Sequence, residues 1–186
     1  AEAVRQVAAF ADYSDYLRSL EMTAVFTDFQ PMYIQRIAQL TNKSNQFNLT
    51  TKRCSEEDIR HMQESDEYIC LCGRLKDKFG DNGIVSVVAG KIEDEVLSIQ
   101  LWLMSCRVLK RGMEDAMMNE LVRLARQRGI MTIRGYYYPT AKNGMVRDFY
   151  VNEGFTRIEE TEKQNVDELQ VDCYTERDIY MQVETL

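Results

Sequence analysis

The chain has 186 residues, 45% of them hydrophobic, and its 23 basic and 30 acidic side chains give a net charge of −7 at pH 7. This length suits one domain with a real hydrophobic core, and the negative charge argues against general nucleic-acid binding, which needs a basic surface. No apolar run approaches the roughly 18 residues of a membrane span, and the first residues do not resemble a signal peptide, so we expect a cytoplasmic protein without membrane contact.

The cysteine pattern favours reduced thiols. Five cysteines are an odd number, and their positions lack the spacing of a disulfide framework: Cys54, Cys70, Cys72, Cys106 and Cys173. The sequence has a single histidine, His61, and no cluster of metal-ligating residues. We therefore expect no zinc or other metal site.

The first third of the chain predicts helices around one strand. Apolar residues at helical spacing predict a helix over 3–20, in a segment that reads as a linker from a longer parent protein. A strand is expected over 22–29, and Pro31 suits the first turn of a helix that runs to about Lys43. After an extended stretch, Ser55 and the acidic residues behind it predict the N-terminus of a short helix.

The middle of the chain predicts a meander of strands and then a crossover. Strands are expected over 68–75, 84–92 and 96–105. The turn over 76–83 is longer than a tight hairpin needs. An amphipathic helix over 113–128 and a strand over 131–138 follow, and this strand–helix–strand unit should place its two strands in parallel.

The last part of the chain predicts a helix from Asn143 to Val151 and two strands, over 155–159 and 171–183, paired around a polar loop. Antiparallel strands come first and strand–helix–strand–helix–strand follows. This order predicts an α/β (α+β) fold with a mixed, mostly antiparallel sheet flanked by helices.

The loop before the helix 113–128 carries a candidate phosphate site. A helix N-terminus presents unpaired N–H groups, and a glycine lets the backbone approach an anion closely, so Gly112 suits a pyrophosphate. The order of elements over Leu103–Phe155 resembles the cofactor cleft of acyl-CoA N-acyltransferases of the GNAT type. The resemblance implies these cofactor-binding residues: Met104, Val108, Lys110, Arg111, Gly112, Met113 and Asn143.

This loop departs from the GNAT pattern Gln/Arg-x-x-Gly-x-Gly/Ala at two positions. Leu109 stands at the Gln/Arg position and Glu114 at the second small residue. Repulsion between Glu114 and a diphosphate at about 4–6 Å would cost on the order of 2–4 kcal/mol, or roughly 1–3 decades in affinity, partly offset by Lys110 and Arg111. The alternative interpretation is that Gly112 only starts a helix whose dipole Glu114 favours.

A second part of the resemblance is the spacing Asn-x6-Tyr-x3-Gly-Phe, formed by Asn143, Tyr150, Gly154 and Phe155. In GNAT enzymes the asparagine contacts pantetheine or caps the helix, and the tyrosine can protonate the departing thiolate. The resemblance therefore implies Tyr150 as a catalytic acid, and a pKa near 10 suits a thiolate leaving group. The alternative is that Tyr150 is a core residue and Gly154 a helix C-cap.

Cys106 is a second candidate catalytic residue, because it follows the strand that leads into the Gly112 loop. A nucleophilic thiol needs a lowered pKa, which Arg107, Lys110 and the helix N-terminus could supply. No histidine lies nearby in the sequence to act as a base, so we favour the alternative of a buried, inert thiol.

Polar residues in two loops are candidates for substrate binding, together with Arg107. They are Asn45, Gln46, Asp81 and Asn82. Loops that carry function sit on a rigid scaffold, but solvated charged loops explain the same residues equally well.

Four segments taken together resemble the C-terminal part of FkbH-like proteins of the HAD-IIIC class: TNKSNQFNLTTKR, RLKDKFGDNGIVSV, LMSCRVLKRGMEDAMM and YYYPTAKNGMVRDFY. The resemblance covers roughly residues 15–186. In that family an N-terminal HAD phosphatase-like domain takes a glyceryl unit from 1,3-bisphosphoglycerate and loads it on an acyl carrier protein, and a GNAT-like domain follows. This chain lacks the Asp-x-Asp-x-Thr/Val motif of the HAD superfamily, so it resembles only the second domain.

Two functions follow from these patterns. In the first, a linker over 1–20 precedes an acyltransferase-type domain over 21–186, which binds an acyl-CoA or a carrier-protein phosphopantetheine thioester and assists acyl transfer. Glu114 favours the carrier-protein arm, because that arm lacks the 3′,5′-ADP diphosphate of CoA. In the second, the domain is not catalytic and docks an acidic carrier protein for the HAD domain on a basic set: Arg107, Lys110, Arg111, Lys52 and Arg53.

Overall fold

The computed structural model describes residues 12–186 and begins with a helix over 12–19, so the part of the predicted N-terminal helix before residue 12 lies outside the described residues. The other elements follow in this order: β1 (Thr23–Thr27), η1 (Pro31–Tyr33), α2 (Ile34–Lys43), α3 (Glu56–Glu64), β2 (Tyr68–Asp77), β3 (Gly80–Glu93), β4 (Val96–Met104), η2 (Cys106–Val108), α4 (Met113–Gln127), β5 (Thr132–Tyr137), η3 (Gly144–Val146), α5 (Phe149–Asn152), β6 (Thr156–Glu160), β7 (Asn165–Gln170), η4 (Val171–Cys173) and β8 (Gln182–Thr185).

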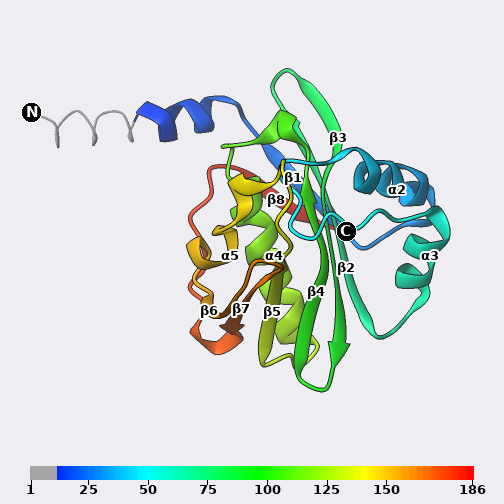
Figure 1. Ribbon diagram of the computed structural model, residues 1–186. Helices are drawn as coiled ribbons and strands as arrows, with labels where there is room; N and C mark the ends of the chain where they lie inside the picture. The colour runs from blue at the N-terminus through cyan, green and yellow to red at the C-terminus, as the bar shows by residue number, and fades with distance from the viewer. Residues whose placement is uncertain (1–11) are drawn as a thin grey trace, which may run out of the picture.

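The strands form one eight-stranded sheet in the order β6-β7-β5-β4-β3-β2-β1-β8. The pairs β4–β5 and β1–β8 are parallel, and the other neighbouring pairs are antiparallel. Figure 1 shows α2 and α3 on one side of this sheet and α4 and α5 on the other. The predicted mixed, mostly antiparallel sheet flanked by helices is confirmed.

Each face of the sheet has its own hydrophobic core. On one face α4 buries its apolar stripe, which includes Met117 and Leu121, against the sheet. On the other face α2 buries Ile37 and Leu40. Full burial of one such side chain contributes roughly 1.5–3 kcal/mol, so these two stripes hold the helices to the sheet.

Local sequence signals define the helices that matter for the site. Ser55 accepts a hydrogen bond from the Asp58 N–H and Asp58 accepts one from the Ser55 N–H, which is a complete capping box at the start of α3. Gly112 precedes α4 with φ at +87°, a left-handed conformation that favours glycine. The chain therefore turns sharply from η2 into α4.

Three predicted elements need correction. The predicted loop over 76–83 is a tight turn, because β2 continues to Asp77 and β3 begins at Gly80. The predicted helix 143–151 is split into η3 and the short α5. The predicted strand 171–183 is mostly irregular: β6 pairs with β7 instead, and β8 adds to the opposite edge of the sheet beside β1. Strand pairing explains two of these cases: β2 and β3 extend into the hairpin by pairing with each other, and β8 pairs with β1. Strand periodicity carries no information about such partners.

Candidate functional site

The two central parallel strands separate along their length. β4 and β5 pair over only three positions, from Val96 with Thr132 to Ser98 with Arg134. Beyond this point β4 continues to Met104 and β5 to Tyr137, but the two strands no longer pair with each other. The two strands therefore diverge, and we call the region between them the wedge.

A segment from the loop after α2 fills this wedge on the β4 side. The Leu49 N–H donates to the Trp102 carbonyl oxygen at 3.0 Å, and the Met104 N–H donates to the Phe47 carbonyl oxygen at 3.0 Å. The Thr50 hydroxyl donates to the Gln100 carbonyl oxygen at 2.9 Å. We call residues Phe47–Thr50 the wedge segment. The wedge segment runs antiparallel to β4. Its hydrogen bonds occupy three backbone groups of β4, on the edge that β5 leaves unpaired.

The wedge segment is also bonded on the side of β5. The Tyr138 N–H donates to the Leu49 carbonyl oxygen at 2.9 Å, and the Asn143 side-chain amide donates to the Asn48 carbonyl oxygen at 3.0 Å. Asn48 and Leu49 are 0% exposed. The chain therefore bridges β4 and the end of β5 with its own backbone.

Asn143, a predicted cofactor contact, is occupied by this bridge. Besides its bond to Asn48, its amide donates to the Tyr138 carbonyl oxygen at 2.9 Å. Its side-chain oxygen accepts from the Thr140 N–H at 2.8 Å and from the Tyr137 hydroxyl at 3.2 Å. The predicted side-chain cap of the following helix is not formed. Asn143 thus binds the loop together.

Tyr150, the predicted catalytic acid, is 1% exposed and lies against Gly135 of β5. A Cβ atom at Gly135 would stand 2.5 Å from the Tyr150 ring, so glycine is what allows this contact. The Tyr150 hydroxyl has no hydrogen-bond partner among the described residues. Burial, and then the negative charge of Asp167, raise the pKa of Tyr150 well above its usual value. At neutral pH the hydroxyl keeps its proton.

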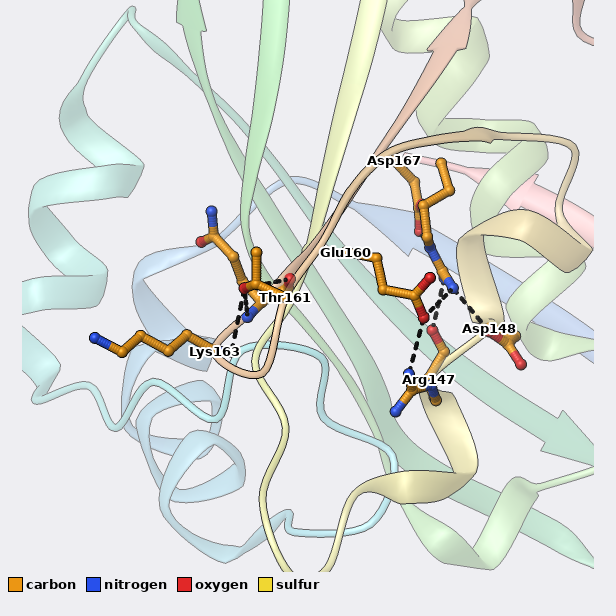
Figure 2. A network of polar contacts seen from close by, with 8 residues as sticks. Arg147, Asp148, Glu160, Thr161, Lys163 and Asp167 are labelled. Carbon is orange, nitrogen blue, oxygen red and sulfur yellow. Dashed lines mark hydrogen bonds and ion pairs between the residues drawn. The ribbon is translucent and has the colours of Figure 1, made fainter.

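An ion-pair network holds α5 and therefore Tyr150 in place. Arg157 contacts Asp167 with Nε at 2.9 Å from Oδ1, and its other nitrogens reach Asp148 at 3.1 Å and the Arg147 carbonyl oxygen at 3.1 Å. Arg147 pairs in turn with Glu160 at 2.9 Å. Figure 2 shows the carboxylates of Asp148, Glu160 and Asp167 converging on this point. We call these five residues the α5–β7 corner.

The start of α4, the predicted phosphate site, contains a carboxylate of the protein itself. Glu114 lies in the first turn, its Oε2 is shielded from solvent, and this atom has no partner among the described residues. Burial raises the pKa of Glu114, and the hydrogen bond from its own backbone N–H opposes that rise. The carboxylate therefore occupies the positive end of the helix, where an anionic ligand would bind.

The other predicted cofactor residues are committed in different ways. Met104, Val108 and Met113 are 0% exposed in the core. Arg111 pairs with Asp77 at 2.8 Å, so its charge is largely neutralised. Lys110 is exposed and has φ at +63°. Of the two predicted basic groups, Lys110 is the one without an ion pair within the described part of the chain.

The predicted nucleophile and substrate residues form a line at the end of β4. Cys106 is exposed, which corrects the expected burial, and its sulfur lies 3.4 Å from Gln46 Oε1. The adjacent Arg107 donates to the Asn82 carbonyl oxygen at 3.3 Å. Asp81, beside Asn82, pairs with Arg74 at 2.8 Å.

Asn45, the neighbour of Gln46, accepts a hydrogen bond from Arg53 instead. The structure therefore brings Gln46, Cys106, Arg107 and Asn82 together. The sequence segments that carry them are far apart in the chain.

An acidic pair missed in the sequence analysis is formed by the buried Glu153 and the half-buried Asp115 in the first turn of α4. Glu153 follows α5, and burial, together with a hydrogen bond to Asp115, raises its pKa to about 9. Arg177 faces both carboxylates, with its Nε 3.3 Å from Glu153 and 3.7 Å from Asp115. No periodicity connects positions so far apart, so the sequence carried no signal for this pair.

The well-formed cavities lie elsewhere. One of about 230 Å³ lies between β1, β2 and the C-terminal half of α4, beside Asp28, Cys70 and Arg123. Of five cavities formed by the described residues, none is lined by Gly112, Tyr150 or the wedge segment.

Over residues 12–186 there is no group of three or more histidine, cysteine or acidic side chains placed to hold a metal ion. In the same range no helix has both the length and the apolar character needed to cross a bilayer. All five cysteines are free thiols.

The fold resembles those of several acetyltransferases. The ribosomal-protein-S18-alanine N-acetyltransferase from Escherichia coli matches with a TM-score of 0.61 and 12% identity over 80% of this chain and 94% of that one. The GNAT domain of S. lividans PAT gives 0.60 and 15% over 78% and 89%. The PaiA N-acetyltransferase from Thermoplasma acidophilum, in complex with coenzyme A, gives 0.57 and 14% over 79% and 98%. No family model and no curated protein sequence matches. At these identities the likeness establishes the GNAT fold.

Proposed function

We propose that this chain is the C-terminal GNAT-fold domain of an FkbH-like protein and serves acyl transfer as an accessory domain that docks an acyl carrier protein. An N-terminal HAD domain of the parent protein would carry the chemistry. The GNAT fold and the four sequence segments quoted above support this assignment. The observation that carries it is the Glu114 carboxylate in the first turn of α4, where a CoA diphosphate would have to bind.

The structurally similar PaiA N-acetyltransferase is in complex with coenzyme A. In this chain, two features at the end of β4 and the start of α4 do not suit that cofactor. The edge of β4 is bonded to the wedge segment, and the start of α4 carries Glu114. Two like charges about 4–6 Å apart in a partly screened site repel by roughly 2–4 kcal/mol. A carrier protein presents no ADP diphosphate, so Glu114 does not oppose its docking.

The docking surface that we propose lies at the tip of the β2–β3 hairpin and the adjoining β4–α4 loop. Lys76, Lys78, Arg107 and Lys110 are exposed there and form no ion pair within residues 12–186. Phe79 at the tip is 80% exposed. Unpaired cations around an exposed aromatic ring suit an acidic protein partner, even though the whole chain carries net negative charge.

Three residues of the basic set expected from the sequence are already bonded within the chain. Arg111 is neutralised by Asp77, and Lys52 donates to the Gln100 side chain at 2.6 Å. Arg53 binds the carbonyl oxygens of Thr41 and Ser44. Arg107 also binds a carbonyl oxygen, but that of Asn82 in the β2–β3 hairpin, so it lies with the hairpin lysines. We therefore keep Arg107 and Lys110 in the docking surface and add Lys76 and Lys78.

Calorimetric titration of the domain with CoA, with acetyl-CoA and with a phosphopantetheinylated carrier protein, at two salt concentrations, tests the proposal. We expect carrier-protein binding that weakens with salt and is reduced about tenfold, or ~1.4 kcal/mol, by Arg107→Glu. Lys163→Glu is the matched control, because this exposed lysine lies on the β6–β7 turn, which β5 and β4 separate from the β2–β3 hairpin in the sheet. Figure 2 shows its side chain pointing away from the ion pairs of the α5–β7 corner. Micromolar CoA binding without carrier-protein binding would overturn the proposal.

A second candidate is an acyltransferase in which Tyr150 donates a proton. The observation that favours it is that the buried Tyr150 hydroxyl and the nearby Trp102 indole N–H both lack partners among the described residues. Under this candidate Tyr150→Phe removes transfer activity and leaves carrier-protein affinity unchanged. Under the accessory proposal the same variant changes neither.

A further inference from the structure

We infer that the wedge segment permanently takes the place along β4 that the fold offers to an extended ligand, so neither CoA nor a phosphopantetheine arm lies between β4 and β5. The inference goes beyond the proposed function, because it concerns the interior of the domain and holds whether or not a carrier protein docks on the outside. It also links the departures of this chain from the GNAT sequence pattern to the ligands that the domain can bind.

Three hydrogen-bonding groups of β4 that face away from β3 are already occupied. An extended chain with amide groups would pair with the backbone of β4 where β5 has separated from it. There the Trp102 carbonyl oxygen and the Met104 N–H are already bonded to Leu49 and Phe47, and the Gln100 carbonyl oxygen to Thr50. A ligand would have to break these bonds before it could form its own.

The wedge segment is also held by hydrogen bonds other than those to β4. The Asn48 amide donates to the Ser44 carbonyl oxygen at 3.1 Å, and its side-chain oxygen accepts from the Thr51 N–H at 2.9 Å. Tyr138 and Asn143 hold the same segment from the β5 side. Displacing the segment would leave buried polar groups without partners, which is strongly unfavourable.

Packing holds the segment as firmly as its hydrogen bonds. Leu49 is buried in the same core as α4, and Phe47 stacks edge-on against Phe149 with ring centroids 5.3 Å apart. The displaced segment would expose both side chains to water. A loop that opens for a ligand has few buried contacts, and this one has many.

The backbone directly after the wedge segment has an unusual conformation. Thr51 has φ at +54°, in the left-handed region that a β-branched residue adopts only under strong constraint. Its neighbours on either side, Thr50 and Lys52, are bonded to the backbone and side chain of Gln100. The surrounding contacts therefore impose this conformation so that the chain follows β4.

Amide hydrogen exchange of the unmodified domain, followed by NMR, tests the inference directly. The reporters are the Leu49 and Met104 amides, and the control is Leu103, whose partner in β3 is Val87. If the wedge is closed, the reporters exchange within about tenfold of the control and do not respond to millimolar CoA. Reporters that exchange at least ~100-fold faster than Leu103 and slow down on addition of CoA would show a ligand site and overturn the inference.

A variant at Glu114 distinguishes exclusion of CoA by the wedge segment from exclusion of CoA by the start of α4. Glu114→Gly restores a small residue in the first turn of α4 and leaves the wedge segment unchanged. We expect CoA affinity to rise by less than about threefold, because the edge of β4 stays bonded. A gain of two decades or more would mean that Glu114 alone excludes CoA, and the inference would fail. Carrier-protein titration judges the proposed function separately, because neither result here depends on it.

Discussion

The wedge segment and the α5–β7 corner both lie beside β5, but they contribute to the fold in different ways. The ion-pair network of the corner, together with the neighbouring contact between Tyr150 and Gly135, keeps α5 against the sheet. In the wedge, the backbone groups that the fold leaves free are bonded to the chain itself. Packing thus keeps the fold intact while the edge of β4 is hydrogen-bonded within the chain. If this is right, the corner is a structural feature, and its variants should change stability most.

The largest effect is expected at the buried ion pair of the corner. Asp167→Ala leaves the Arg157 guanidinium, whose side chain is 19% exposed, without its bidentate partner. Removing one partner of a buried pair typically costs about 3–5 kcal/mol, and we expect about 4 kcal/mol in urea unfolding. Asp172→Ala, at an exposed aspartate, is the control. A loss below ~1 kcal/mol would mean that the network does not hold the corner.

The next effect tests the contact between Gly135 and Tyr150. In Gly135→Ala the new Cβ would lie 2.5 Å from the Tyr150 ring, which is enclosed by Trp102, Phe149 and Phe155. Overpacking of this kind costs about 1–3 kcal/mol, and we expect the upper end because the ring has no room to move. Gly144→Ala, where a Cβ meets nothing within 4 Å, should unfold at nearly the wild-type urea concentration.

A smaller loss is expected in the wedge. Asn143→Ala leaves the Asn48 and Tyr138 carbonyl oxygens and the Thr140 N–H without a partner, at a cost of about 2 kcal/mol. It should also speed amide exchange at Leu49. Asn152→Ala, at an exposed position, serves as the control. Unchanged exchange at Leu49 would show that the wedge segment does not need Asn143.

The smallest effect concerns pH. Glu153 has an ordinary pKa near 4.5 when unfolded and one of about 9 when folded. The folded state therefore holds one more proton between these values, so the stability that this group contributes is full below about 4.5 and falls as the pH rises to about 9. Glu153→Gln should flatten the decline by about 1 kcal/mol between pH 6 and 8, because Asp115 and Arg177 respond to the same titration. Parallel wild-type and variant curves from urea unfolding would contradict the raised pKa.

Much of the fold could be predicted from the sequence because its signals are local. Ser55 and Asp58 defined the start of α3, and Pro31 the start of the η1–α2 helix. Gly112 and the apolar stripe behind it predicted α4 to within one residue. The candidate site was harder, because its chemistry depends on which groups remain free. Arg111 and Asn143 have suitable side chains, yet Asp77 and Asn48 already bind them.

The sequence by itself determined the helices, most of the strands and the negative charge at the start of α4, because caps, periodicity and residue identity act over a few neighbouring positions. Only the tertiary structure decided that Phe47–Thr50 lies against β4 and that β8 lies beside β1 rather than beside β6 or β7. It also decided that Cys106 is exposed and that Tyr150 is sealed in the core. These outcomes depend on contacts between residues that are mostly far apart in the chain, such as Thr50 with Gln100 and Thr23 with Gln182. A one-dimensional pattern does not record which backbone groups such contacts satisfy.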